Sequence, residues 1–131
     1  MADIVINPVS AVFEKWANGI KKVVGEGHYS MDINSTVTVI PYARMFLMGN
    51  PGAKWDLAGN ETATNASFQV ESYYSGVKPL ENVYAIDSAS HALMTAMGFR
   101  RNYGPELITN ADSNIKRVVS RYTRIFTGEE L

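Results

Sequence analysis

The sequence predicts an α+β domain, a two-layer sandwich in which two helices pack on one face of a mainly antiparallel sheet of four or five strands. Apolar residues recur at helical spacing over residues 8–24 and 79–97. Strand-like segments lie between these helices and again after the second one. Because both helices need an apolar sheet face to cover, the order α-β-β-α-β-β predicts two layers around one core.

The length and composition agree with one independently folding unit. A chain of 131 residues without cysteine has enough residues for a core and excludes disulfides and thiolate metal sites. We therefore expect residues 1–131 to form a single domain, with a flexible C-terminal tail from about residue 127. No apolar stretch approaches the roughly 18 residues of a membrane span, so we expect no membrane partner.

The first helix is predicted over residues 8–24. Asn7 is a favourable N-cap, and Pro8 suits the first helical position because the N–H that it lacks would be unpaired there anyway. Gly25 is a natural end. The stripe predicted to be buried is Val9, Val12, Phe13, Trp16, Ile20, Val23 and Val24.

Two strands are predicted between the helices, after the polar linker GEGHYSMDINS. Pro41 lies inside the first, TVTVIPYARMFLM, and indicates an edge position, a bulge or a break, because proline cannot donate to the strand ladder. The second, ETATNASFQVESYY, alternates between two faces. One face holds Ala66, Phe68, Val70 and Tyr74, and the other holds Asn65, Ser67, Gln69 and Glu71. The segment GNPGAKWDLAGN between them is too long for a tight turn and is expected to be a loop.

The second helix is expected to open at Pro79 and to end at Gly98. An alanine stripe on it (Ala85, Ala89, Ala92 and Ala96) predicts a close approach to a sheet or another helix. The segments FRRNYGPELIT and NIKRVVSRYTRIF then read as two strands. In the last strand, alternation places Arg117, Val119, Arg121 and Ile125 on one face and Val118, Tyr122, Arg124 and Phe126 on the other. Neither face is purely apolar.

Positive charge is concentrated near the end of the chain. Residues 1–98 hold six Lys/Arg against nine Asp/Glu, whereas residues 99–126 hold six against two, although the net charge of the whole chain is -1. This asymmetry indicates one basic face rather than a general affinity for polyanions.

The sequence offers no catalytic constellation, and we expect a non-enzymatic protein without metal or cofactor. Asp87 and His91 have the spacing of a helical metal pair but no third ligand nearby, which favours a hydrogen-bonded pair. Nucleic-acid binding by arginines interleaved with aromatic residues is a weaker alternative, because the sequence pI is only about 6.1.

A protein interface explains more of the composition. Methionine, tyrosine, tryptophan and arginine are enriched at interfaces. The chain has six methionines, seven tyrosines and two tryptophans. The residues that we predict to contact a neighbouring subunit or partner are Lys54, Trp55, Arg100, Arg101, Arg117, Arg121 and Arg124.

Three segments resemble the tail terminator, or tail-completion, proteins of long-tailed bacteriophages, which are also described as minor capsid proteins. SFQVESYYSG is similar to the central strand of that family, AIDSASHALMTAMGFRR to its second helix and the strand start that follows, and IKRVVSRYTRIF to its closing strand. The resemblance covers most of residues 8–127.

The resemblance implies a structural role in the virion. Such proteins form a homo-oligomeric ring, usually a hexamer, at the head-proximal end of the tail tube, where they end tube growth and present a surface for head and neck attachment. The implied partners are the tail tube protein and the neck or head-completion proteins, and DNA is only cargo passing through the channel. The implied location is the virion tail or neck, after synthesis in the host bacterial cytoplasm. Alternatives are another neck or tail component, such as a head-closure or tail-tube protein, or a small ligand- or nucleic-acid-binding α+β module.

Overall fold

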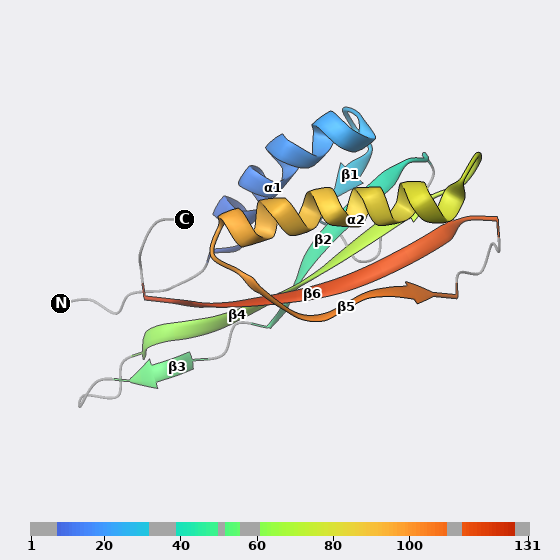
Figure 1. Ribbon diagram of the computed structural model, residues 1–131. Helices are drawn as coiled ribbons and strands as arrows, with labels where there is room; N and C mark the ends of the chain where they lie inside the picture. The colour runs from blue at the N-terminus through green and yellow to red at the C-terminus, as the bar shows by residue number, and fades with distance from the viewer. Residues whose placement is uncertain (1–7, 32–38, 50–51, 56–60, 110–113, 128–131) are drawn as a thin grey trace.

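The computed structural model describes residues 8–31, 39–49, 52–55, 61–109 and 114–127, with the backbone alone for 52–55, 61 and 62. Both helices lie over the same side of one sheet (Figure 1). The elements in chain order are α1 (Val9–Val24), β1 (Tyr29–Ser30), β2 (Tyr42–Gly49), β3 (Gly52–Trp55), β4 (Glu61–Tyr74), α2 (Pro79–Ala96), β5 (Arg100–Ile108) and β6 (Lys116–Phe126).

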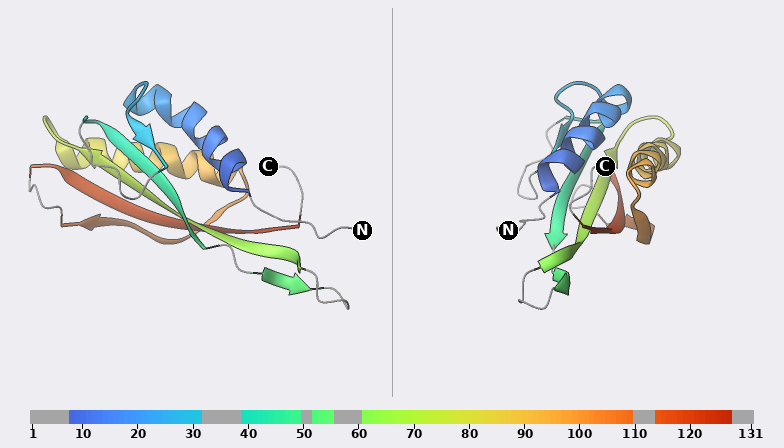
Figure 2. Two further views of the ribbon diagram at one scale, coloured as in Figure 1. Left: turned by 180° about the vertical axis from the view of Figure 1, so that it is seen from behind. Right: turned by 90° about the vertical axis from the view of Figure 1, so that its left-hand side faces the viewer.

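Strand β4 is the centre of the sheet. The strand order is β1-β2-β4-β6-β5, and β3 pairs with the first part of β4 on the same edge as β2. The views in Figure 2 show that β3 and the beginning of β4 project beyond the helices. All pairings are antiparallel except the short pairing of β1 with β2.

The core lies between the helices and the even-numbered side chains of β4. Ala66, Phe68 and Val70 are fully buried there, as the alternation predicted. From α1, Trp16 is also fully buried, and its indole donates to Ser90 Oγ of α2 at 3.1 Å. The helices approach closely at Gly19, where an added Cβ would lie 2.3 Å from Leu93 Cδ2.

The predicted helices are confirmed with small differences at their ends. Pro8 occupies the N-cap position of α1 rather than the first helical position, and its carbonyl accepts from Val12 N–H at 2.9 Å. Asn7 lies outside the described residues. Gly98, with φ of +82°, follows the end of α2, as predicted.

Several side chains predicted to be buried face solvent. Val23 of the predicted stripe on α1 is 46% exposed. The predicted packing of the alanine stripe on α2 is wrong, because Ala85, Ala92 and Ala96 are exposed. The buried side of α2 instead includes two polar residues, Asp87 and Ser90. Hydrogen bonds to these buried side chains hold the helix in a rotation that turns most of the alanines outward.

The α+β class is confirmed, but the predicted sheet of four or five strands in the order α-β-β-α-β-β needs correction. The described residues form six strands, because β1 and β3 lie within segments predicted as linker and loop. The parallel pairing of β1 with β2 makes the sheet mixed. Tertiary contacts place β1: Ala43 N–H donates to the His28 carbonyl at 3.1 Å, and His28 Nδ1 donates to the Pro41 carbonyl at 2.9 Å. Pro41 marks a break, since β2 begins at Tyr42. The C-terminal tail, predicted to be flexible, falls mainly on residues outside the described ones.

Candidate functional site

The side of the sheet turned away from the helices carries the most organised polar cluster of the described residues. We call this side the open face. Strand alternation and cross-strand register place its side chains, since directly paired residues point to the same side. It comprises Tyr42, Arg44 and Phe46 of β2, Gln69, Glu71 and Tyr73 of β4, Arg100, Tyr103 and Glu106 of β5, and Arg117, Val119, Arg121 and Ile125 of β6.

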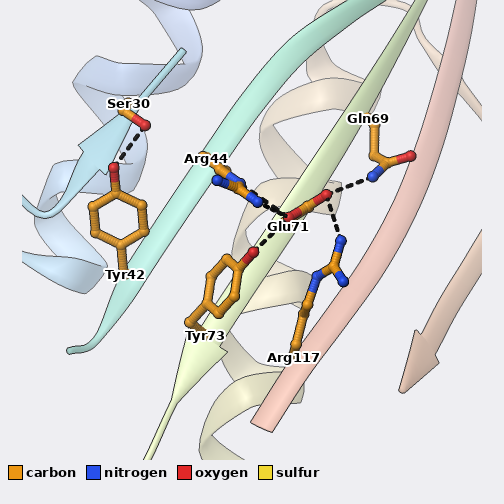
Figure 3. A network of polar contacts seen from close by, with 7 residues as sticks. All are labelled: Ser30, Tyr42, Arg44, Gln69, Glu71, Tyr73 and Arg117. Carbon is orange, nitrogen blue, oxygen red and sulfur yellow. Dashed lines mark hydrogen bonds and ion pairs between the residues drawn. The ribbon is translucent and has the colours of Figure 1, made fainter. Parts of the chain in front are cut away.

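Glu71 lies at the centre of the open face and is only 1% exposed. Arg44 Nη2 lies 2.9 Å from Glu71 Oε1, and Arg44 Nε donates to the same oxygen at 2.9 Å. On the opposite strand, Arg117 Nη2 donates to Oε2 at 2.9 Å. Figure 3 shows the carboxylate held between two guanidinium groups from β2 and β6.

Neighbouring residues of β4 complete the coordination of this carboxylate. Tyr73 OH donates to Glu71 Oε1 at 2.6 Å, and Gln69 Nε2 donates to Oε2 at 2.5 Å. Both donors come from positions two residues away, which the pleat brings to the same side of the strand. The carboxylate therefore accepts hydrogen bonds from residues of three strands, β2, β4 and β6, and from neither helix among these contacts.

The electrostatics of the cluster favour an ionised Glu71. Burial by itself would raise the pKa of this carboxyl, but hydrogen bonds from Arg117 and Tyr73 and the charges of Arg44 and Arg117 outweigh burial. Together they lower the pKa of Glu71 from 4.5 to about 2. Burial and the hydrogen bond to Glu71 raise the pKa of Tyr73 from 10.0 to about 12.

A second group of contacts extends the network to the edge strand. Arg121 Nε donates to Gln69 Oε1 at 2.9 Å, and its guanidinium lies over the Tyr103 ring, 4.6 Å from the centroid. Tyr103 OH in turn donates to Glu106 Oε2. The polar layer thus crosses the sheet from β2 through β4 and β6 to β5.

The seven predicted interface residues separate into three groups. Arg100, Arg117 and Arg121 belong to the open face. Arg101 and Arg124 point to the helix side, where Arg101 Nη1 lies 3.8 Å from Asp87 Oδ2 and Arg124 Nη1 donates to the Met97 carbonyl at the end of α2. The backbones of Lys54 and Trp55 lie in β3, far along the sheet from the Glu71 cluster.

Polar residues under α2 have structural partners. Ser120 Oγ donates to Asp87 Oδ1 at 2.7 Å, and His91 Nδ1 lies 3.3 Å from Tyr122 OH. Burial raises the pKa of Asp87, although Ser120 and Arg101 oppose this effect. Asp87 and His91 therefore do not act as a pair, because each contacts a different residue of β6. Among the residues that the structure describes, no group of three His, Cys, Asp or Glu side chains is placed to hold a metal ion.

Sequence reasoning missed the partners that organise the open face. The alternation of β4 did place Gln69 and Glu71 on the side opposite the core, and Glu71 is the only acidic residue of the segment SFQVESYY. What the sequence lacked was the register that sets Glu71 opposite Arg44 on β2 and two positions from Arg117 on β6.

The comparisons with known proteins show the fold. No protein-family model matches the sequence, and no curated protein sequence does. Among solved structures, a chain described as "Virion of native gene transfer agent (GTA) particle" has a similar fold, with a TM-score of 0.55 and 12% sequence identity. The match covers 86% of this chain and 88% of that chain. Neither helix of the described residues has the length and apolar character needed to cross a membrane.

Proposed function

We propose that this protein is a structural component of a phage-like virion and acts as its tail terminator. The observation that carries the proposal is the fold shared with a chain of a gene transfer agent virion over 86% of this chain and 88% of that chain. Because the match extends over most of both chains, it concerns the whole domain and not a common supersecondary unit. The resemblance of three sequence segments to tail terminators makes the role more specific.

In this role, copies of the chain form a ring, usually a hexamer, on the last ring of the tail tube. The ring ends tube polymerisation and offers the neck and head-completion proteins a surface, and DNA passes only through its channel. The protein is then located in the virion and has no catalytic activity, cofactor or metal. The open face supports a protein contact, because its polar groups form one layer across four strands.

Nucleic-acid binding has less support from the open face. Stacking on bases requires accessible rings, but Tyr42 and Tyr73 are only 6% and 3% exposed. The guanidinium groups of Arg44 and Arg117 are both engaged by Glu71. These groups are poorly placed to follow a phosphate backbone.

Deletion of the gene in the bacterium that produces the particles tests the proposed role. A tail terminator is expected to leave DNA-filled heads and separate tails of uncontrolled length in electron micrographs. Loss of a head-closure protein would instead give tails of normal length, and loss of the tube protein would give no tails. Restoration by the wild-type gene is the control. Normal particles after deletion would contradict any role in the virion.

A further inference from the structure

The open face carries more positive than negative charge. Among the strand residues that the structure describes, four arginines on this face stand against two carboxylates, which leaves +2. The arginines are Arg44, Arg100, Arg117 and Arg121, and the carboxylates are Glu71 and Glu106. Arg44 and Arg117 share Glu71, whereas neither Arg100 nor Arg121 forms an ion pair with a described carboxylate.

Arg121 is fixed in orientation but keeps donors available. Its Nε donates to Gln69 Oε1 at 2.9 Å, and its Cζ lies over the Tyr103 ring, 4.6 Å from the centroid. In the part of the chain that the structure describes, these contacts leave both terminal amino groups, Nη1 and Nη2, without an acceptor. Because the guanidinium is already held, it loses less rotamer freedom when a partner binds to it.

A β-bulge turns Arg100 to the same face. Arg100 pairs with Thr123 of β6, and Tyr103 pairs with Arg121. The two β5 residues are three positions apart, whereas their partners are two apart. In a regular strand, residues three positions apart point to opposite faces, but the extra residue Asn102 lets both β5 side chains point to the open face. Arg100 is exposed, and its side chain has no partner among the described residues.

The two arginines are diagonal neighbours with no carboxylate between them. Thr123 lies opposite Arg100 and two residues from Arg121, which sets the two arginines roughly 7–8 Å apart. The Glu71 cluster shows how this face satisfies such a pair, because one carboxylate there accepts from guanidinium groups of two strands. The pair of Arg100 and Arg121 has the donors of that arrangement and lacks its acceptor.

An aliphatic side chain borders the pair. Ile125, two residues beyond Thr123 on the same face, is 52% exposed. An acidic polypeptide segment with an apolar residue can contact both the guanidinium groups and this side chain. A phosphate backbone gains little from Ile125, and the carboxylates of Glu71 and Glu106 interrupt the row of cations that it would follow. The chemistry of this surface therefore favours a protein partner.

We propose that Arg100 and Arg121 bind a carboxylate of an acidic segment in another protein of the particle, with Ile125 against an apolar residue of that segment. The inference rests on the proposed function for the location of the partner, and it names the chemistry by which that partner is recognised. Charge-assisted hydrogen bonds from two guanidinium groups supply orientation as well as affinity.

Fluorescence anisotropy with the purified full chain tests this binding. The probe is a fluorescein-labelled peptide of glutamates around a central leucine, in buffer of low ionic strength because salt screens surface charges. We expect the wild type to bind the peptide and the arginine variant, Arg100→Gln with Arg121→Gln, to raise the Kd by at least about tenfold. The same peptide with glutamines in place of glutamates is expected not to bind.

The matched control is Lys15→Gln with Lys22→Gln, which makes the same charge change on exposed positions of α1. Its Kd is expected to stay within about twofold of the wild-type value. Circular dichroism identifies misfolding. If the arginine variant does not fold, Arg100→Gln alone replaces it, because this exposed side chain has no role in packing, and its Kd is expected to rise about threefold.

Four results would each overturn the inference. The wild type does not bind the peptide, or the control variant weakens binding as much as the arginine variant does. A double-stranded DNA fragment binds more tightly than the peptide through the same arginines, which would assign the surface to nucleic acid. Self-association of the wild type in sedimentation velocity is lost in the arginine variant, which would assign the surface to a second copy of the chain.

The outcome is separable from the proposed function. If the wild type does not bind the peptide but deletion of the gene gives tails of uncontrolled length, the inference fails and the proposed function stands. If peptide binding depends on the two arginines but deletion leaves normal particles, the proposed function fails and the binding surface stands.

Discussion

Replacing Glu71 with glutamine is expected to destabilise the protein through the open face, although this side chain lies on the side of the sheet opposite the main core. The wild-type carboxyl has its pKa lowered from 4.5 to about 2. Since each tenfold change in an ionisation constant is worth about 1.4 kcal/mol, this corresponds to about 3 kcal/mol in favour of the folded, ionised state. Glu71→Gln keeps the size of the side chain but removes the charge that Arg44 and Arg117 share. We expect a loss of about 3 kcal/mol in the free energy of unfolding at pH 7.

The dependence on pH makes this prediction specific. Because the folded-state pKa lies below the unfolded value, the stabilisation is present above about pH 4.5 and is lost as the pH falls through about 2. Protonated glutamic acid is then nearly equivalent to glutamine. The difference between wild type and variant should therefore shrink from about 3 kcal/mol at pH 7 towards zero near pH 2.

Urea unfolding of both proteins at a series of pH values measures the difference and cancels the titration of all other groups. Glu106→Gln is the matched control, because this exposed carboxylate contacts Tyr103 rather than a pair of guanidinium groups. It should cost less than about 1 kcal/mol. A Glu71→Gln loss that stays constant from pH 7 to pH 2, or that is no larger than that of the control, would refute the reasoning.

Three further predictions concern other parts of the fold. Trp16→Ala should lower the free energy of unfolding by about 3–5 kcal/mol, measured by urea denaturation, because the side chain is fully buried between the helices and the sheet; an unchanged midpoint would contradict that placement. Gly104→Ala should prevent stable folding or cost several kcal/mol in a thermal melt, since φ is +83° and the new Cβ would lie 2.3 Å from the Val119 carbonyl oxygen. Ultraviolet titration should show Tyr73 and Tyr122 ionising near pH 12, because burial raises both pKa values from 10.0 to about 12. Since the folded-state pKa is the higher one, the associated stability is present below pH 10 and is lost towards pH 12. Ionisation of all tyrosines near pH 10 in the folded protein would disprove this prediction.

Local sequence patterns were sufficient to predict the helices and strands that have a strong hydrophobic periodicity. The stripe around Trp16 and the glycine after α2 predicted both helices, and the alternation of Phe68 and Val70 predicted which side of β4 faces the core. These signals are local, because side-chain period and end residues act within a few positions of the chain.

The parts that were missed depend on contacts distant in the sequence. Strand β1 has only two residues and is held by His28, which contacts a segment 13 positions away. The Glu71 cluster joins residues 27 and 46 positions apart. Such pairings follow from strand register, which the sequence of any one strand does not contain. The alternation of side chains along each strand therefore predicted which residues share a face of the sheet, but not which of them contact each other.

The irregular path of β5 has a consequence for how this protein behaves at high concentration. β5 forms one edge of the sheet, and its pairing with β6 is interrupted between Arg101 and Tyr103 and again between Tyr103 and Glu106. Pro105, within the second interruption, has no N–H to offer to an added strand. A regular edge would recruit another sheet without limit and lead to fibrillar aggregates. The interrupted edge of β5 therefore disfavours such edge-to-edge growth between molecules.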